Sequence, residues 1–114
     1  MSSLLERARE TLKIEIAGLE GLIERLGAEF EEAVKLLYAC QGKVILAGMG
    51  KSGLIAQKIA ATLTSTGTPA LFLHAGESTH GDLGIITKQD VVIAFSYSGE
   101  TNEVLQMIGH IQAI

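Results

Sequence analysis

Two glycine-rich segments carry the residue types that bind a small anion. The segment Gly48-Met49-Gly50-Lys51-Ser52-Gly53 follows an apolar run and opens a stretch of helical period. Free backbone N–H groups and the helix dipole favour an anion at such a position. The segment Ser96-Tyr97-Ser98-Gly99-Glu100-Thr101 has the same placement, and its hydroxyl groups can donate to phosphate oxygens. Together they predict a phosphate site, although the second segment alone could be an ordinary helix cap.

Two known glycine loops compete for the first segment. A Walker A loop needs a glycine five positions before Gly50-Lys51-Ser52, and that position is Ile45, so the spacing excludes it. Gly48, Gly50 and Gly53 match the dinucleotide pattern G-x-G-x-x-G. The next apolar run, however, ends in His74 and not in an acidic residue that could bind a ribose. A nucleotide-dependent enzyme therefore remains the weaker alternative.

A polar stretch at 74–84 lies between the two segments. His74, His80, Glu77 and Asp82 are candidates there for proton transfer or metal binding. The two histidines are six residues apart with no helical phase. Their spacing therefore gives no metal-ligand geometry.

The elements that position these segments follow from the apolar pattern. Continuous apolar runs at 43–47, 70–74 and 90–96 predict strands that are buried on both faces. Helical period at 52–66, ended by Gly67 as a cap, and at 99–114 predicts the intervening helices. This order is the doubly wound parallel α/β plan, with strands in the order 2-1-3 and the loops sharing one crevice at the carboxyl edge.

The first 40 residues are predicted to be helical, with apolar residues at three- and four-residue steps. Ser3 and Glu6 form a possible capping box, and a break is expected near Gly27. The apolar stripe must pack on the domain's own sheet or on another copy of the chain. We favour an oligomer interface and expect a homo-oligomer, a dimer or a tetramer.

Composition limits the class of protein. The chain has 114 residues, 47% of them hydrophobic, which fits one compact domain and argues against a disordered chain. Its net charge of −4 argues against nucleic acid or an anionic membrane as the main partner. Cys40 is the only cysteine, so no internal disulfide can form. No apolar run reaches the roughly 18 residues of a membrane span, and we expect a cytoplasmic protein.

Five motifs in register resemble those of the arabinose-5-phosphate isomerases, which are built on the sugar isomerase (SIS) domain. They lie at 48–53, 65–69, 74–77, 80–84 and 96–101, and Ala75 replaces a proline common in that family. The resemblance implies a flavodoxin-like α/β fold, with N-terminal helices at 1–40 and a β-α-β-α-β-α sugar-phosphate-binding core at 41–114. It also implies a single partial domain over 1–114, whose C-terminal strands are missing.

The resemblance further implies interconversion of D-ribulose 5-phosphate and D-arabinose 5-phosphate through an enediol, without a cofactor, for Kdo and lipopolysaccharide synthesis. Lys51 and Glu103 match catalytic positions, although either could be an ordinary exposed residue at a helix start. His74 also matches a position linked to inhibitory zinc. The family places a further glutamate and histidine beyond Ile114, so poor activity is expected, and a non-catalytic regulatory SIS module is the alternative. The matched substrate-binding positions are Gly50, Ser52, Gly67, Thr68, His74, His80, Ser96, Ser98, Gly99, Glu100 and Thr101.

Overall fold

The structure is a computed structural model that describes residues 3–80, 82–97 and 102–114, with the backbone alone at 78–80 and 82. It divides into two compact units, Met1–Lys35 and Leu36–Ile114. No helix of the described residues combines the length and the apolar character needed to cross a membrane. The predicted sugar-phosphate site belongs to the second unit.

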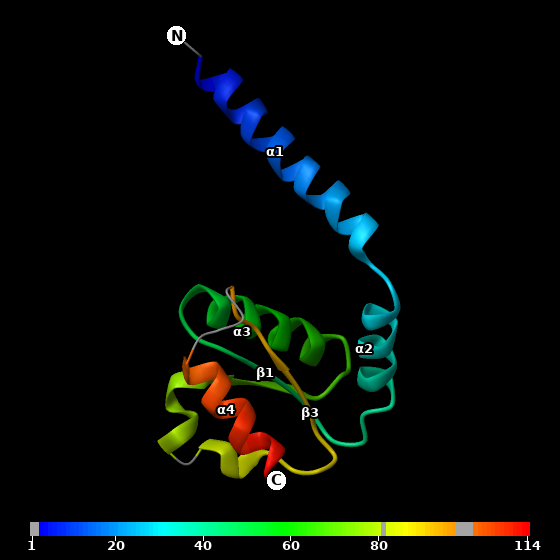
Figure 1. Cartoon of the computed structure of the whole chain (residues 1–114), viewed down its shortest axis with the longest axis vertical. Coiled ribbons are helices and arrows are strands. Elements are labelled where there is room, and N and C mark those ends of the chain that lie inside the picture. The colour runs from blue at the N-terminus through cyan, green and yellow to red at the C-terminus, as the bar shows by residue number, and fades with distance from the viewer. Residues whose placement is uncertain (1–2, 81, 98–101) are drawn as a thin grey trace. The chain divides into compact units, whose positions relative to one another are not determined.

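The first unit is helical and breaks where the glycine pattern predicts. Helix α1 (Leu4–Arg25) starts with a capping box, in which Glu6 N donates to Ser3 Oγ at 3.0 Å and Ser3 N donates to Glu6 Oε2 at 3.2 Å. Helix α2 (Ala28–Tyr38) begins after Gly27, whose carbonyl accepts from Phe30 N and Glu31 N (Figure 1). The capping box and the break are thus both confirmed.

Helix α1 has no buried residue. Its apolar stripe is largely exposed, with Ile16 53%, Leu19 63% and Ile23 68% accessible. The unit on its own therefore leaves this stripe uncovered.

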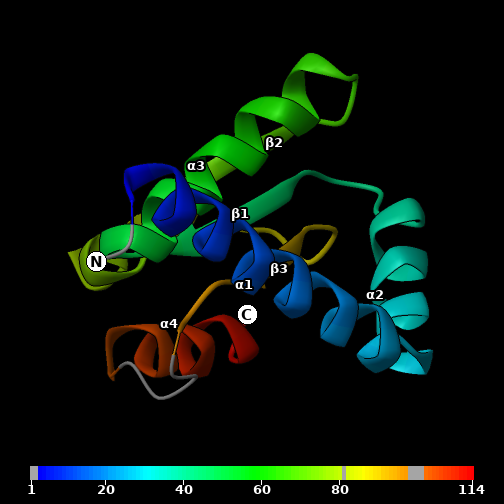
Figure 2. The same ribbon diagram turned by 90° about the horizontal axis from the view of Figure 1, so that it is seen from above.

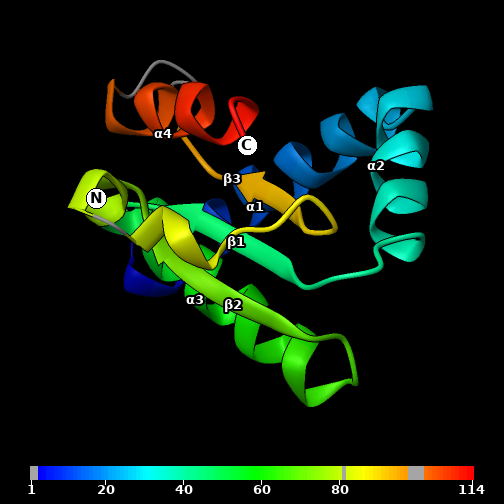
Figure 3. The ribbon, with the colours of Figure 1, turned by 90° about the horizontal axis from the view of Figure 1, so that it is seen from below.

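The second unit is built on a parallel sheet of three strands, β1 (Val44–Gly48), β2 (Ala70–His74) and β3 (Val91–Ala94). The strand order is β2-β1-β3, as the sequence predicts, and Figure 2 shows β1 between its two neighbours. Helix α3 (Gly50–Ser65) and helix α4 (Asn102–Gln112) lie on opposite faces (Figure 3). This is the doubly wound arrangement.

Each face of the sheet has its own apolar core. Alternate residues of β1 point to the two faces. Ile45 and Ala47 pack in one cluster with Val104 and Met107 of α4. Val44 and Leu46 pack in the other with Ala56 and Ala60 of α3. Helices α3 and α4, which begin in or directly after the two glycine-rich segments, thus both pack against the same central strand.

Burial differs from the prediction at the outer strands. Only β1 is buried along its whole length, whereas β2 and β3 are mostly half-buried. The reason is their position, because each has a neighbouring strand on one side only. The polar stretch after β2 forms two short 3₁₀ helices, η1 (Ala75–His80) and η2 (Asp82–Ile85).

Candidate functional site

The three predicted loops begin at one edge of the sheet. Gly48, the last residue of β1, pairs in register with His74, the last residue of β2. Ala47 pairs with Ala94 of β3, and Phe95 N donates to the Ala47 carbonyl at 2.8 Å. The strands are parallel, so the segments that follow them leave from the same carboxyl edge. The expected shared crevice is consistent with this geometry.

The start of α3 is suited to hold an anion. Its cap residue, Met49, is extended (φ −146°, ψ 161°) and makes no side-chain capping bond. Gly50 has a φ of +58°, a conformation that favours glycine. Backbone N–H groups at an uncapped helix start can donate to a ligand. Lys51 is exposed and Ser52 half-buried beside them.

Gly48 allows the strand and the helix to approach closely. A Cβ on Gly48 would lie 3.0 Å from the Ser52 carbonyl group and from Gly53 N. Gly53 has the same role on the helix, because a Cβ on Gly53 would lie 3.3 Å from the Gly48 carbonyl group. The glycine pattern at 48–53 thus has a packing role that holds the anion-binding turn against β1.

His74 stands at the end of β2 with one ring nitrogen enclosed. Its imidazole lies edge-on to the Phe72 ring, at 6.4 Å between centroids and 90° between planes. Its Nδ1 is buried and has no hydrogen-bond partner among the described side chains and backbone. The residue as a whole is half-buried, so the imidazole remains partly accessible.

The remaining residues of this edge come from β3 and α4. Ser96, the second residue after β3, is half-buried, and Tyr97 is fully exposed. Glu103 is exposed in the first turn of α4, next to the buried Val104. The predictions for Ser98, Gly99, Glu100 and Thr101 lie outside the described residues, as does the side chain of His80.

Gly67 and Thr68 lie at the other end of the sheet. They follow the last turn of α3, where Gly67 has a φ of +100° and Thr68 N donates to the Leu63 carbonyl at 2.9 Å. The next residue, Pro69, accepts from Val44 N at the start of β1. Gly67 is thus a helix-ending glycine as predicted, but a single copy of the chain does not bring it or Thr68 to the crevice. The reason is the length of α3, which spans the sheet.

A zinc ion at His74 does not fit the described residues. They contain no group of three His, Cys, Asp or Glu side chains able to hold a metal ion. A zinc-bound histidine usually donates its other ring N–H to an acceptor, and His74 Nδ1 has none among these residues.

The amino end of the sheet holds a polar cluster that sequence reasoning missed. Asp90, whose side chain is 1% exposed, accepts from Lys43 Nζ at 2.7 Å, Lys43 N at 2.9 Å and Thr87 N at 2.8 Å. Burial raises the pKa of Asp90, but the hydrogen bonds and the charge of Lys43 outweigh it and lower the pKa from 3.8 to about 2. The signal available in the sequence for this pair was that Lys43 and Asp90 each directly precede an apolar strand.

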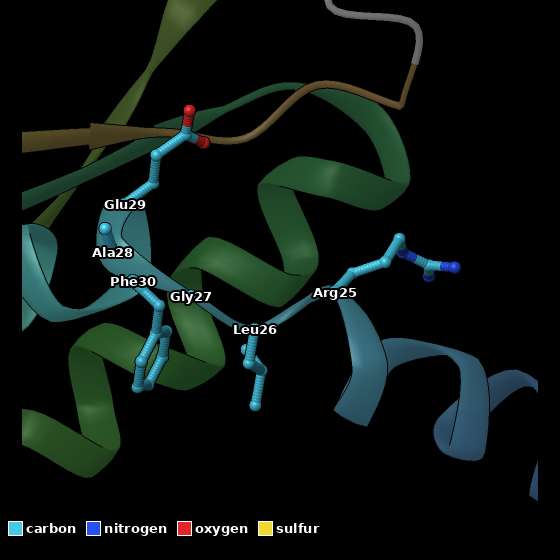
Figure 4. Close-up of a pocket in the computed structure, with 6 residues that line it drawn as sticks. All are labelled: Arg25, Leu26, Gly27, Ala28, Glu29 and Phe30. Carbon is cyan, nitrogen blue, oxygen red and sulfur yellow. The ribbon is translucent and has the colours of Figure 1, made fainter.

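Two hollows in the described part of the surface lie away from the carboxyl edge. One of about 560 Å³ lies at the break between α1 and α2, where the side chains of Leu26 and Phe30 point to one side and Glu29 to the other (Figure 4). Another of about 370 Å³ lies beside β3 and the end of α4. The first hollow lacks converging polar groups, which a binding site for a polar ligand needs.

Sequence comparison decides the family. The SIS domain model matches residues 37–113. The chain belongs to the SIS domain family. Arabinose 5-phosphate isomerase KdsD of Yersinia pestis is 52% identical over 103 residues, which cover 90% of this chain and 31% of that protein. Arabinose 5-phosphate isomerase GutQ of Escherichia coli K12 is 50% identical over 102 residues, covering 90% of this chain and 32% of that protein. The chain thus spans about a third of these relatives.

Solved structures give the same assignment. Escherichia coli CFT073 c3406, in complex with arabinose 5-phosphate, matches with a TM-score of 0.90 and 43% identity, over 99% of this chain and 61% of that one. A putative phosphosugar isomerase involved in capsule formation from Bacteroides fragilis matches with a TM-score of 0.73 and 34% identity, over 87% and 58%. The SIS fold predicted from the motifs is confirmed.

Proposed function

We propose that this chain is the sugar-phosphate-binding part of an arabinose-5-phosphate isomerase. The observation that carries the proposal is the convergence of the α3 start, His74 and Ser96 at one sheet edge. The identity of about 50% to arabinose 5-phosphate isomerases supports it, as does the similarity to a protein solved with arabinose 5-phosphate. In this proposal the phosphate lies against the α3 start and the segment at 96–101, and the sugar extends towards His74.

The reaction moves a proton between C1 and C2 through an enediol. Such a step needs a base for the proton and a positive or acidic group for the developing oxyanion. We assign Lys51 and Glu103 to these tasks, because both are exposed in the first turns of the helices that follow β1 and β3. The proposed pathway is Kdo and lipopolysaccharide synthesis in the cytoplasm.

The alternative is a module that binds a sugar phosphate without converting it. The first test is calorimetric titration of the chain with D-arabinose 5-phosphate, with D-arabinose and inorganic phosphate as matched ligands. Saturable binding of the sugar phosphate, tighter than either part alone, is expected. Binding of none of the three would contradict both proposals.

The second test separates the two proposals. A coupled assay with D-arabinose 5-phosphate should show turnover about 10²–10⁴ below that of a full-length relative, the range expected when one acid or base is missing. Loss of this residual turnover in Glu103→Gln, with binding retained, would support catalysis. Binding without turnover in the unmodified chain would favour the regulatory module.

We also propose that a second copy covers the apolar stripe of α1. Leu12, Ile16, Leu19 and Ile23 share one face of the helix, and all are more than half exposed. The expected species in sedimentation is larger than the 12.1 kDa chain. Leu19→Lys should shift it towards the monomer, whereas Ile14→Lys, on the opposite side of the helix and 67% exposed, should not. A monomeric unmodified chain at micromolar concentration would contradict this.

A further inference from the structure

Gly76 covers one edge of the His74 imidazole. Gly76 belongs to η1, two residues after His74. A Cβ added to Gly76 would lie 2.9 Å from His74 Cε1 and 3.2 Å from His74 Nδ1. The same Cβ would lie 3.9 Å from the Met49 methyl group, in the loop that precedes α3. The space that a side chain would fill at position 76 is therefore already occupied by the imidazole.

Phe72 provides a second wall for the same ring. Its ring meets the imidazole at 90°, and its Cζ lies 3.6 Å from the place of a Cβ on Gly53. The Phe72 ring and Gly76 thus both border the imidazole. Its Nδ1 is the enclosed nitrogen, and this leaves Nε2 as the nitrogen that can reach a ligand.

We propose that Gly76 is a positioning residue, which acts through His74 by fixing the imidazole so that Nε2 is presented to the sugar. This rests on the proposed function in one respect, namely that the ligand of His74 is a sugar phosphate. The backbone of Gly76 does not have a positive φ, so its conformation admits alanine. The cost of a methyl group then falls on the imidazole, the end of a flexible side chain, and Gly76→Ala displaces the ring while the fold remains.

Gly84→Ala is the matched control. Gly84 lies in η2, also without a positive φ, and a Cβ there would have no described neighbour within 4 Å. The first readout is the set of long-range ¹H–¹⁵N correlations of the imidazole rings, in which His74→Ala identifies the His74 signals. Gly76→Ala should shift the His74 ring signals, and Gly84→Ala should leave them in place.

The second readout is affinity for two ligands. Gly76→Ala should weaken binding of D-arabinose 5-phosphate about tenfold, or about 1.4 kcal/mol, the size of one charge-neutral hydrogen bond. Affinity for inorganic phosphate should stay within about twofold, because the α3 start does not change. In the His74→Ala background Gly76→Ala should cause no further loss, as expected when one residue acts through the other.

Each contrary result counts against the proposal. Unmoved His74 ring signals in Gly76→Ala overturn it, and so does a loss that adds fully to that of His74→Ala. Failure of Gly76→Ala to fold also overturns it, because the added methyl group would then disturb the backbone and not only the His74 imidazole. If the unmodified chain does not bind D-arabinose 5-phosphate, the proposed function fails, while the ring signals still decide whether Gly76 positions His74.

Discussion

The two ends of the parallel sheet differ in how their polar groups are used. At the amino end, the Asp90 side chain is 1% exposed and accepts from three donors of Lys43 and Thr87. Cys40 Sγ also donates there, to the Lys43 and Gln89 carbonyls at 3.6 Å. At the carboxyl end, the α3 start has no side-chain cap and Lys51 is exposed. Internal bonding stabilises the first end, and the second keeps donors for a ligand.

The largest expected effect is on stability, from Asp90→Ala. This change leaves the Lys43 and Thr87 N–H groups and the Lys43 ammonium without their acceptor, although Lys43 Nζ keeps the Ile85 carbonyl at 2.6 Å. Breaking a buried pair on one side costs about 3–5 kcal/mol, and the 26% exposure of the Lys43 side chain lowers this to about 2–4. Urea unfolding measures it, with exposed Lys88→Ala as control. A fall of less than about 0.5 kcal/mol in the free energy of unfolding would contradict the claim that internal bonding at the amino end stabilises the fold.

A smaller loss is expected from Gly42→Ala. A Cβ on Gly42 would overlap Asp90 Oδ1 and lie 3.0 Å from the Gln89 carbonyl group, which is backbone and cannot easily move. Crowding of this kind costs about 1–3 kcal/mol. Gly109→Ala in α4, where a Cβ would have no described neighbour within 4 Å, should instead gain up to about 1 kcal/mol in helix propensity. The two variants should therefore change the urea midpoint in opposite directions, and equal changes would contradict the close contact.

The sequence predicted local features better than contacts between residues far apart in the chain. The strand order, the α1–α2 break and the Ser3 capping box depend on local patterns of glycine and apolar residues, and all three were correct. The Lys43–Asp90 pair joins residues 47 positions apart, so their places before two apolar strands could not show that they bond to each other. The contact of Gly76 with His74 depends on the path of η1 in three dimensions. The placement of Gly67 and Thr68 away from the crevice follows from the length of α3.

Acid should weaken the amino end selectively. The pKa of Asp90 is lowered to about 2, so its stabilising effect is present above the unfolded value of 3.8 and is lost as the pH falls towards 2. The difference of about 2 pH units corresponds to at most about 2.5 kcal/mol, and partial screening makes about 1–2 more realistic. Urea unfolding at pH 5 and pH 2 should show this extra loss in the unmodified chain and not in Asp90→Asn. Parallel losses in both proteins would assign the acid effect to other carboxylates.

The smallest expected effect on stability is that of Lys51→Met, at the opposite end. Lys51 is exposed, and a surface change of this kind stays within about 0.5 kcal/mol. Its effect on binding should be large, because one cation at the α3 start is removed while the backbone N–H groups remain, and phosphate affinity should fall about tenfold. Lys58→Met is the matched control, since Lys58 is exposed further along the same helix.

The two ends can be compared directly by measuring both stability and phosphate affinity in one variant of each end. Lys51→Met should lose phosphate affinity and keep its urea midpoint, whereas Asp90→Ala should lose its midpoint and, when assayed well below that midpoint, keep phosphate affinity within about twofold. Equal loss of affinity in Lys51→Met and Lys58→Met would mean that only the net charge of α3 attracts the anion. Loss of both properties in the variant of either end would show that the two ends are coupled through β1, which begins directly after Lys43 and ends at Gly48. If each variant loses only the one property expected of it, stability depends on the amino end of β1 and ligand binding on its carboxyl end, and the two can be changed separately.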